Sequence, residues 1–224
     1  MFEATGAALP LILPLGDRGL LVRFADTLSS DANRRAVAFA RRLRAALPDG
    51  VTEIDPNLVS VLLRYDPARV DFDRLAGEVR LILSAPMDEA ATRPTVHRLA
   101  VTFGGAVGPD LAEVAATLGL SAAAFVAAHN AVPLRVLATG FAPGFVYCGF
   151  HEPALRVPRR ASVRPPVEPG SVLFAAGQTA IAATPVPTGW HLIGRTGFIN
   201  FDATRDPPTV LQEGDLVAFE AVPA

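Results

Sequence analysis

Apolar residues in the first third of the chain follow two repeats, one typical of strands and one typical of helices. Alternation over residues 19–24 and 57–65 predicts two strands, and the run 51–54 predicts a third. From Asp31 onward, and again over residues 72–83, apolar residues recur every three or four positions, which predicts two amphipathic helices. The predicted order, β-α-β-β-α followed by a further strand, is typical of a small open sheet with helices on one face.

Residues 87–94 are polar and unpatterned, and a region rich in short strands follows them. A strand over residues 97–103 leads into a glycine-rich turn and two short helices. From Leu134 onward, short apolar strands alternate with Gly and Pro turns, which predicts a closed or nearly closed β barrel. The clearest of these strands are residues 171–176, 181–183, 191–194 and 216–222. We therefore predict an α+β protein with two domains, residues 1–90 and 91–224.

Charge and hydropathy argue against a membrane or nucleic-acid role. The uncharged run between Glu113 and Arg135 is long enough to span a bilayer, but Gly119 and Ser121 interrupt it with helix-stop and helix-start chemistry. A net charge of -2 attracts neither nucleic acid nor an anionic membrane. The single cysteine, Cys148, allows no internal disulfide and fits a reducing cytosol. We expect a soluble cytoplasmic protein that binds neither nucleic acid nor membrane.

Arginines are concentrated on the first predicted helix. They are Arg34, Arg35, Arg41, Arg42 and Arg44. A nucleic-acid face and a solvated helix surface both fit such a cluster. The solvated surface is favoured, because no aromatic residue interleaves the charges and the overall charge is negative.

The chemistry-bearing residues outside this helix form no compact constellation. The four histidines, at positions 97, 129, 151 and 191, lack metal-ligand spacing, so no metal site is expected. The glycine-rich turn 104–110 precedes a helix and could bind an anion, but Asp110 already complements the helix dipole there. Cys148, in an apolar strand, is expected to be inert packing. His129 fits a core hydrogen bond and a site role equally well.

Residues 139–196 alternate Gly and Pro with aromatic residues and arginines, a composition that makes shaped loops on a β scaffold. The arginines of this region are Arg159, Arg160, Arg164 and Arg195. Guanidinium groups suit carboxylate or phosphate ligands, and they also brace loops by donating to carbonyl oxygens. The residues alone therefore predict a small anionic or amide ligand at these loops, but no particular reaction and no catalytic residue.

Several motifs in the chain resemble those of one family. They include Gly140-Phe141, Pro143-Gly144-Phe145, Pro158-Arg159, Gly170-Ser171-Val172, Gly177-Gln178-Thr179, Gly189-Trp190 and Gly194-Arg195-Thr196, with Gly104-Gly105, Gly108-Pro109-Asp110 and His129 upstream. On these residues, the chain resembles the allophanate hydrolase subunit 1 family, which includes the B subunit of 5-oxoprolinase and the kinase inhibitor of the sporulation pathway.

The resemblance implies a fold and an activity. The fold would be a small N-terminal α/β domain of ferredoxin-like type followed by a cyclophilin-like β barrel. The activity would be ATP-dependent opening of 5-oxoproline, a cyclic amide, to glutamate. The chain would act with a larger sister subunit that carries a related barrel, of the allophanate hydrolase subunit 2 type. ATP would be a cofactor of the complex.

The matched motifs also imply residue roles. Substrate-binding residues would be Arg159, Arg164, Gln178, Trp190, Arg195 and His129. In this set the arginines would position an anion or a loop, Gln178 would contact an amide, and Trp190 would form an apolar wall. The residues that shape the loops would be Gly140, Pro143, Gly144 and Gly170.

The chain departs from the family pattern at several polar positions. Ala106 replaces an acidic residue, and Ala182 stands where the family usually has a tyrosine. Both changes remove hydrogen-bonding capacity. A second hypothesis therefore stays open, namely a regulatory protein that inhibits a sensor histidine kinase. Prolyl isomerase activity is a third and less favoured one, since a fold alone does not carry function.

Overall fold

The computed structural model describes residues 10–85 and 94–223 of the chain. The chain divides into two compact units, Met1–Arg93 and Pro94–Ala224. The predicted domain boundary, between residues 90 and 91, lies outside the described residues.

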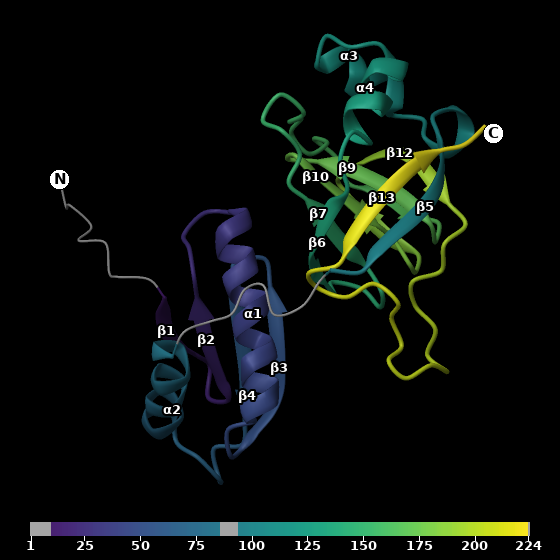
Figure 1. Ribbon diagram of the computed structural model, residues 1–224. Helices are drawn as coiled ribbons and strands as arrows, with labels where there is room; N and C mark the ends of the chain where they lie inside the picture. The colour runs from purple at the N-terminus through teal and green to yellow at the C-terminus, as the bar shows by residue number, and fades with distance from the viewer. Residues whose placement is uncertain (1–9, 86–93, 224) are drawn as a thin grey trace, which may run out of the picture. The chain divides into compact units, whose positions relative to one another are not determined.

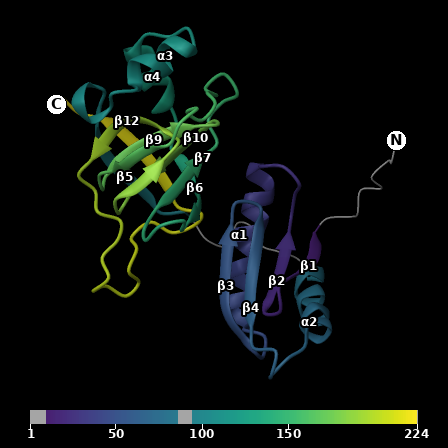
Figure 2. The same cartoon turned by 180° about the vertical axis from the view of Figure 1, so that it is seen from behind.

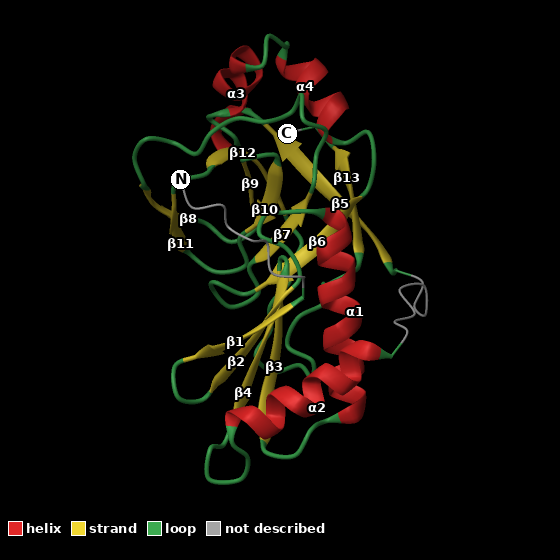
Figure 3. Cartoon of the chain, turned by 90° about the vertical axis from the view of Figure 1, so that its left-hand side faces the viewer, coloured by secondary structure: helices red, strands yellow, loops and turns green. Residues whose placement is uncertain are grey.

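The N-terminal unit is a sheet with two helices. Its elements are β1 (Leu11–Leu15), β2 (Gly19–Arg23), α1 (Ser30–Ala46), β3 (Val51–Asn57), β4 (Ser60–Tyr65) and α2 (Phe72–Ser84). The strands lie in the order β1-β2-β4-β3 and all pairs are antiparallel. Alternate residues of β2 and β4 pack against α1 and α2 (Figure 3) in one buried core that includes Leu20, Val22, Phe39, Leu43, Val61, Leu63, Leu75 and Val79.

The alternation and the helical repeats predicted β2, β3, β4 and both helices correctly. The further strand predicted after the second helix, Val96–Phe103, belongs to the barrel and not to this sheet. Strand β1 was not predicted, since Pro10 and Pro14 interrupt its apolar run. A proline is tolerated there because β1 is an edge strand, where not every N–H has a ladder partner. The element order of the unit, ββαββα, differs from the βαββαβ order of a ferredoxin-like fold, so that part of the prediction is not confirmed.

The C-terminal unit is built on a closed barrel. Its elements are β5 (Val96–Phe103), η1 (Gly105–Val107), α3 (Leu111–Thr117), α4 (Ala122–His129), β6 (Leu134–Thr139), β7 (Val146–Gly149), β8 (Arg164–Val167), β9 (Ser171–Ala175), β10 (Gln178–Ile181), β11 (Val186–Thr188), β12 (His191–Thr196) and β13 (Leu216–Ala221). The barrel order is β10-β7-β6-β13-β5-β12-β9, and β9 pairs with β10. Strands β8 and β11 pair separately beside it (Figure 3). The predicted barrel is confirmed.

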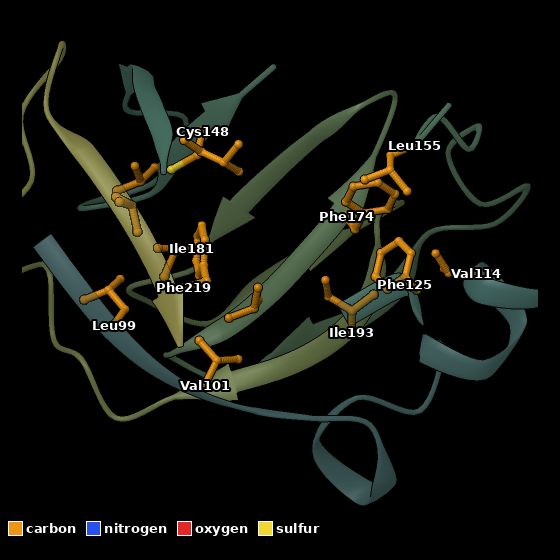
Figure 4. Close-up of a cluster of buried hydrophobic side chains, with 14 of the residues drawn as sticks. Leu99, Val101, Val114, Phe125, Cys148, Leu155, Phe174, Ile181, Ile193 and Phe219 are labelled. Carbon is orange, nitrogen blue, oxygen red and sulfur yellow. The ribbon is translucent and has the colours of Figure 1, made fainter. Parts of the chain in front are cut away.

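Helices α3 and α4 lie at one end of the barrel (Figures 1 and 2). Phe125 of α4 points into the interior, where its ring lies 5.2 Å from that of Phe174, which lies beside Leu155 (Figure 4). The two helices meet at 86°, as the stop at Gly119 and the cap at Ser121 predict, and no single helix in the described residues is long and apolar enough to cross a membrane.

The barrel wall has an inner and an outer apolar layer. Val172, Phe174 and Ile193 face the interior core, together with Cys148, which is fully buried. Burial raises the pKa of the Cys148 thiol to about 12, which agrees with inert packing. The outer layer is a second cluster, made of Phe145, Val167, Leu173, Ala175, Ala180, Ala182, Val186 and Trp190.

Candidate functional site

The glycine-rich turn after β5 lies along the backbone of β12. The Gly104 N–H donates to the Ile193 carbonyl at 3.0 Å, and the Asp110 N–H donates to the Leu192 carbonyl at 3.1 Å. Gly108 makes this approach possible, since a Cβ there would lie 2.2 Å from the Ile193 oxygen. The turn therefore fixes Asp110 beside the start of β12.

The Asp110 carboxylate accepts hydrogen bonds from two arginines and one backbone N–H. Arg164 Nη2 lies 2.6 Å from Oδ2 and 2.8 Å from Oδ1, Arg160 Nη1 lies 3.2 Å from Oδ1, and the Leu192 N–H donates to Oδ2 at 2.7 Å. Asp110 is buried and makes no side-chain bond to the N-terminus of α3. The carboxylate therefore joins the turn, β8 and β12 instead of capping the helix.

A row of aromatic rings lies on the outer layer of the barrel. The Arg159 guanidinium stands 5.7 Å from the Trp190 ring, and Trp190 lies 5.9 Å from Tyr147, which continues to Phe145 at 4.9 Å. Burial raises the pKa of Tyr147, and the charge of Arg159 opposes that shift. Trp190 is buried beneath Arg159, so the predicted apolar wall is covered in this structure. Phe141, which contacts Phe145, is 75% exposed.

A pocket of about 550 Å³ opens between the glycine-rich turn and the end of β12. It is lined by residues 102–107 and 195–197. Arg195 is exposed, and its guanidinium makes no ion pair or hydrogen bond with any residue that the structure describes. The pocket thus combines a free cation with a glycine-rich wall, two features that lie about ninety residues apart in the sequence.

A chain of polar side chains crosses the barrel interior beneath α4. His129 Nδ1 lies 2.6 Å from Asn130 Oδ1, and Thr179 Oγ1 lies 2.8 Å from both His129 Nε2 and His151 Nε2. A carboxamide oxygen only accepts, so His129 carries its proton on Nδ1 and its Nε2 accepts from the Thr179 hydroxyl. The Thr179 oxygen then accepts from His151 Nε2–H.

The imidazoles of His129 and His151 are both neutral at neutral pH. Burial lowers the pKa of His129 to about 4, and the bond to Asn130 only partly opposes that shift. Burial and, to a smaller extent, the neighbouring His129 together lower the pKa of His151 to about 3. Of the two roles open to His129, the structure therefore supports the core hydrogen bond.

The six predicted substrate-binding residues do not converge on one pocket. Arg159 and Trp190 contact each other, Arg164 binds Asp110, and Arg195 lines the glycine pocket. His129 lies inside the barrel. Gln178 is 5% exposed, and its Nε2 has no hydrogen-bond partner in the described part of the chain.

The predicted loop-shaping residues lie in loops that flank strands of the barrel. Gly140, Gly144 and Gly170 all have positive φ, and Pro143 lies between the first two. A Cβ on Gly144 would lie 2.4 Å from that of Phe201, and one on Gly170 would lie 2.1 Å from the Thr196 oxygen. These two positions therefore exclude any side chain.

Three polar residues with a clear structural role escaped the sequence-based site prediction. Asp110 has the sequence signature of a helix N-terminus, which hides its role in binding two arginines. Thr179 and His151 lie 28 residues apart and meet only inside the closed barrel. The match of Gly177-Gln178-Thr179 to a family motif was the one signal available for Thr179.

Comparison with known proteins decides the family. Residues 10–211 match the family described as the carboxyltransferase domain, subdomains C and D. The chain belongs to this carboxyltransferase-domain family. Within the family it is 35% identical over 206 residues to the B subunit of 5-oxoprolinase from Escherichia coli O157:H7, a match that covers 92% of this chain and 93% of that protein. It is 31% identical over 215 residues to the B subunit of 5-oxoprolinase from Bacillus subtilis (strain 168), covering 92% and 90%.

A solved structure has a similar fold. The crystal structure of TTHA0988 matches with a TM-score of 0.80 and 38% identity over 92% of this chain. The match covers only 40% of the TTHA0988 chain, so a unit like this one occurs there within a longer polypeptide. The family resemblance carried by the sequence motifs is confirmed.

Proposed function

We propose that this chain is the B-type subunit of a 5-oxoprolinase complex, which opens 5-oxoproline to glutamate together with a larger sister subunit. The observation that carries the proposal is the match to three relatives, each of them a 5-oxoprolinase B subunit, at 30–35% identity over at least nine-tenths of both chains. A subunit designation implies partners. The chain is accordingly not expected to act alone.

The chemistry of the substrate points to the pocket beside Arg195. 5-Oxoproline carries one carboxylate and one lactam, so its site requires a cation and hydrogen-bonding groups. Of the three arginines assigned to the substrate, Arg164 is bound to Asp110 and Arg159 lies on Trp190, whereas Arg195 is free in a pocket of about 550 Å³. We assign the substrate carboxylate to Arg195 on that ground.

ATP is assigned to the complex and not to this chain. The glycine-rich turn would be its most plausible phosphate cradle by sequence. However, the N–H groups of Gly104, Gly108 and Asp110 all donate to carbonyl oxygens of the protein, and the Asp110 carboxylate is already bound by Arg160 and Arg164. These three N–H groups are therefore not available to the oxygens of a triphosphate.

Replacing Arg195 with alanine in the assembled complex is expected to lower kcat/KM for 5-oxoproline by about 10- to 100-fold. A hydrogen bond to a charged group is worth roughly 1.5–3 kcal/mol, and each 1.4 kcal/mol is about a factor of ten. The loss should fall mainly on KM, because the carboxylate is held equally in the ground and transition states. The measurement is the rate of ATP-dependent glutamate release at varied concentrations of 5-oxoproline.

Arg98→Ala is the matched control, since Arg98 is an exposed barrel arginine that pairs with Glu220 outside the pocket. Its kinetic constants should equal those of the parent complex. An unchanged KM in Arg195→Ala would refute only the placement of the substrate carboxylate at Arg195, and not the proposed function. Equal glutamate release with and without this chain would refute the function itself.

A further inference from the structure

The N-terminal unit contains a pocket that the proposed function does not use. Its volume is about 500 Å³, and residues of β1, α1 and α2 line it. Arg35 comes from α1 and Arg80 from α2, while Leu11, Ile12 and Leu83 supply apolar surface. Strand β1 and helix α2 lie side by side there (Figures 1 and 2). All of these residues belong to one compact unit.

Arg35 and Arg80 differ from the other arginines of this unit. Every other arginine within residues 10–85 has an interaction partner, in most cases a carboxylate. Among the described residues, neither Arg35 nor Arg80 has a carboxylate or carbonyl partner. The Arg35 guanidinium lies over the face of the Phe24 ring, at 5.4 Å from its centroid. The two arginines of this unit that have neither a carboxylate nor a carbonyl partner among the described residues therefore line the same pocket.

Helix termini do not account for these charges. The carbonyl at the end of α2 is taken by Arg42, whose Nη1 donates to the Ala85 oxygen at 2.9 Å. Arg80 lies before the last turn of α2, so it does not cap that terminus. The Ser84 hydroxyl donates to the Leu81 carbonyl at 2.8 Å, so its oxygen remains available as an acceptor at the pocket wall.

No acidic residue is among the described residues that line this pocket. Two guanidinium groups in such a setting repel each other, and the repulsion is strongest where water is partly excluded. Arg35 is only partly exposed, and its contact with Phe24 fixes the guanidinium in place. A bound anion would remove the repulsion and satisfy the donors of both groups. A phosphate monoester carries a charge of about -1.5 to -2 at neutral pH, which matches two arginines.

We infer that the pocket between β1, α1 and α2 binds a small phosphate monoester with an apolar substituent. The phosphate lies between Arg35 and Arg80, and the substituent packs on Leu11, Ile12 and Leu83. The site is separate from the pocket of Arg195, since the two lie in different compact units. The inference is independent of the proposed enzymatic role.

The test is isothermal titration of the full chain with n-butyl phosphate, inorganic phosphate and 1-butanol. We expect one site for butyl phosphate, about tenfold weaker binding of inorganic phosphate, and no measurable binding of butanol, because the charge supplies most of the affinity. Arg80→Gln and Arg35→Gln should each weaken butyl phosphate binding about tenfold. Because Arg35 also packs on Phe24, the exposed Arg80 provides the variant that leaves folding unaffected.

Arg74→Gln is the matched control, since Arg74 lies on the same helix, pairs with Glu78 and does not line the pocket. Its affinity for butyl phosphate should equal that of the parent. Equal affinity in all three variants, or no binding of butyl phosphate at ~10 mM, would overturn the inference. Vesicles that contain phosphatidic acid, whose headgroup is a phosphate monoester, distinguish a lipid headgroup from a free ligand. Arginine-dependent binding to vesicles without binding to butyl phosphate would also overturn it.

Discussion

Replacing Asp110 with asparagine is expected to lower the free energy of unfolding of the barrel unit by about 3–5 kcal/mol, the usual cost of breaking a buried ion pair. The carboxylate accepts from Arg160, Arg164 and the Leu192 N–H. In the variant, the amide oxygen still accepts hydrogen bonds, but the amide NH2 group is a donor and faces the N–H donors that the carboxylate had bound. Two mostly buried guanidinium groups are then left close together with no counter-charge.

Denaturant unfolding followed by tryptophan fluorescence measures this effect, because Trp190, the one tryptophan of the chain, lies in the barrel unit. Glu220→Gln is the control, since it removes an ion pair with Arg98 that is largely exposed. The control should change the free energy of unfolding by less than about 1 kcal/mol. A similarly small change in Asp110→Asn would show that the cluster is not the link between the turn, β8 and β12.

Acid is expected to destabilise the barrel unit well before its carboxylates protonate. His129 and His151 have folded pKa values of about 4 and about 3, below the ordinary 6.5 of an unfolded chain. Well above pH 6.5, both histidines are neutral in the folded and in the unfolded state, so their full contribution to stability is present. As the pH falls below 6.5, the unfolded state binds protons and the folded state does not. By pH 5, each histidine therefore lowers the free energy of unfolding by on the order of 2 kcal/mol, and the two together lower it by about 4 kcal/mol.

The free energy of unfolding at pH 7.5, 6 and 5 tests this linkage, again by tryptophan fluorescence. His151→Gln removes one titrating group and leaves an amide that can donate to Thr179, so the loss between pH 7.5 and pH 5 should be roughly halved. A parent protein equally stable at pH 7.5 and pH 5 would contradict the prediction. So would a variant with the same pH dependence as the parent.

Local pattern was sufficient for most of the fold. Ser29 caps α1, and the apolar repeat of Ala36, Phe39, Ala40 and Leu43 predicts the buried face of that helix. Strand β10 shows where local pattern fails. The apolar residues 181–183 were predicted as the strand, whereas the structure places it at Gln178–Ile181. Thr179 can be buried there because His129, fifty residues away in sequence, satisfies its hydroxyl.

The candidate site was less predictable than the fold, because each of its clusters joins distant parts of the chain. The motifs around Arg159, Trp190 and Arg195 indicate functional loops, but nothing local shows that Arg164 binds Asp110, 54 residues earlier. Only barrel closure pairs Arg160 and Arg164 with Asp110 and places Arg195 at a pocket. Sequence motifs therefore identified the region, and the pairing of charges identified the free cation.

The position of β13 has a consequence for biosynthesis. This last strand lies between β6 and β5, pairing with β5 in parallel and with β6 in antiparallel fashion. During translation, β5 and β6 are therefore made long before the strand that separates them. Their edges stay unpaired until Leu216–Ala221 has been synthesised, whereas the elements of the N-terminal unit are complete by Ser84. The interval between these two points is when the nascent chain is most exposed to edge-to-edge aggregation and depends most on chaperones.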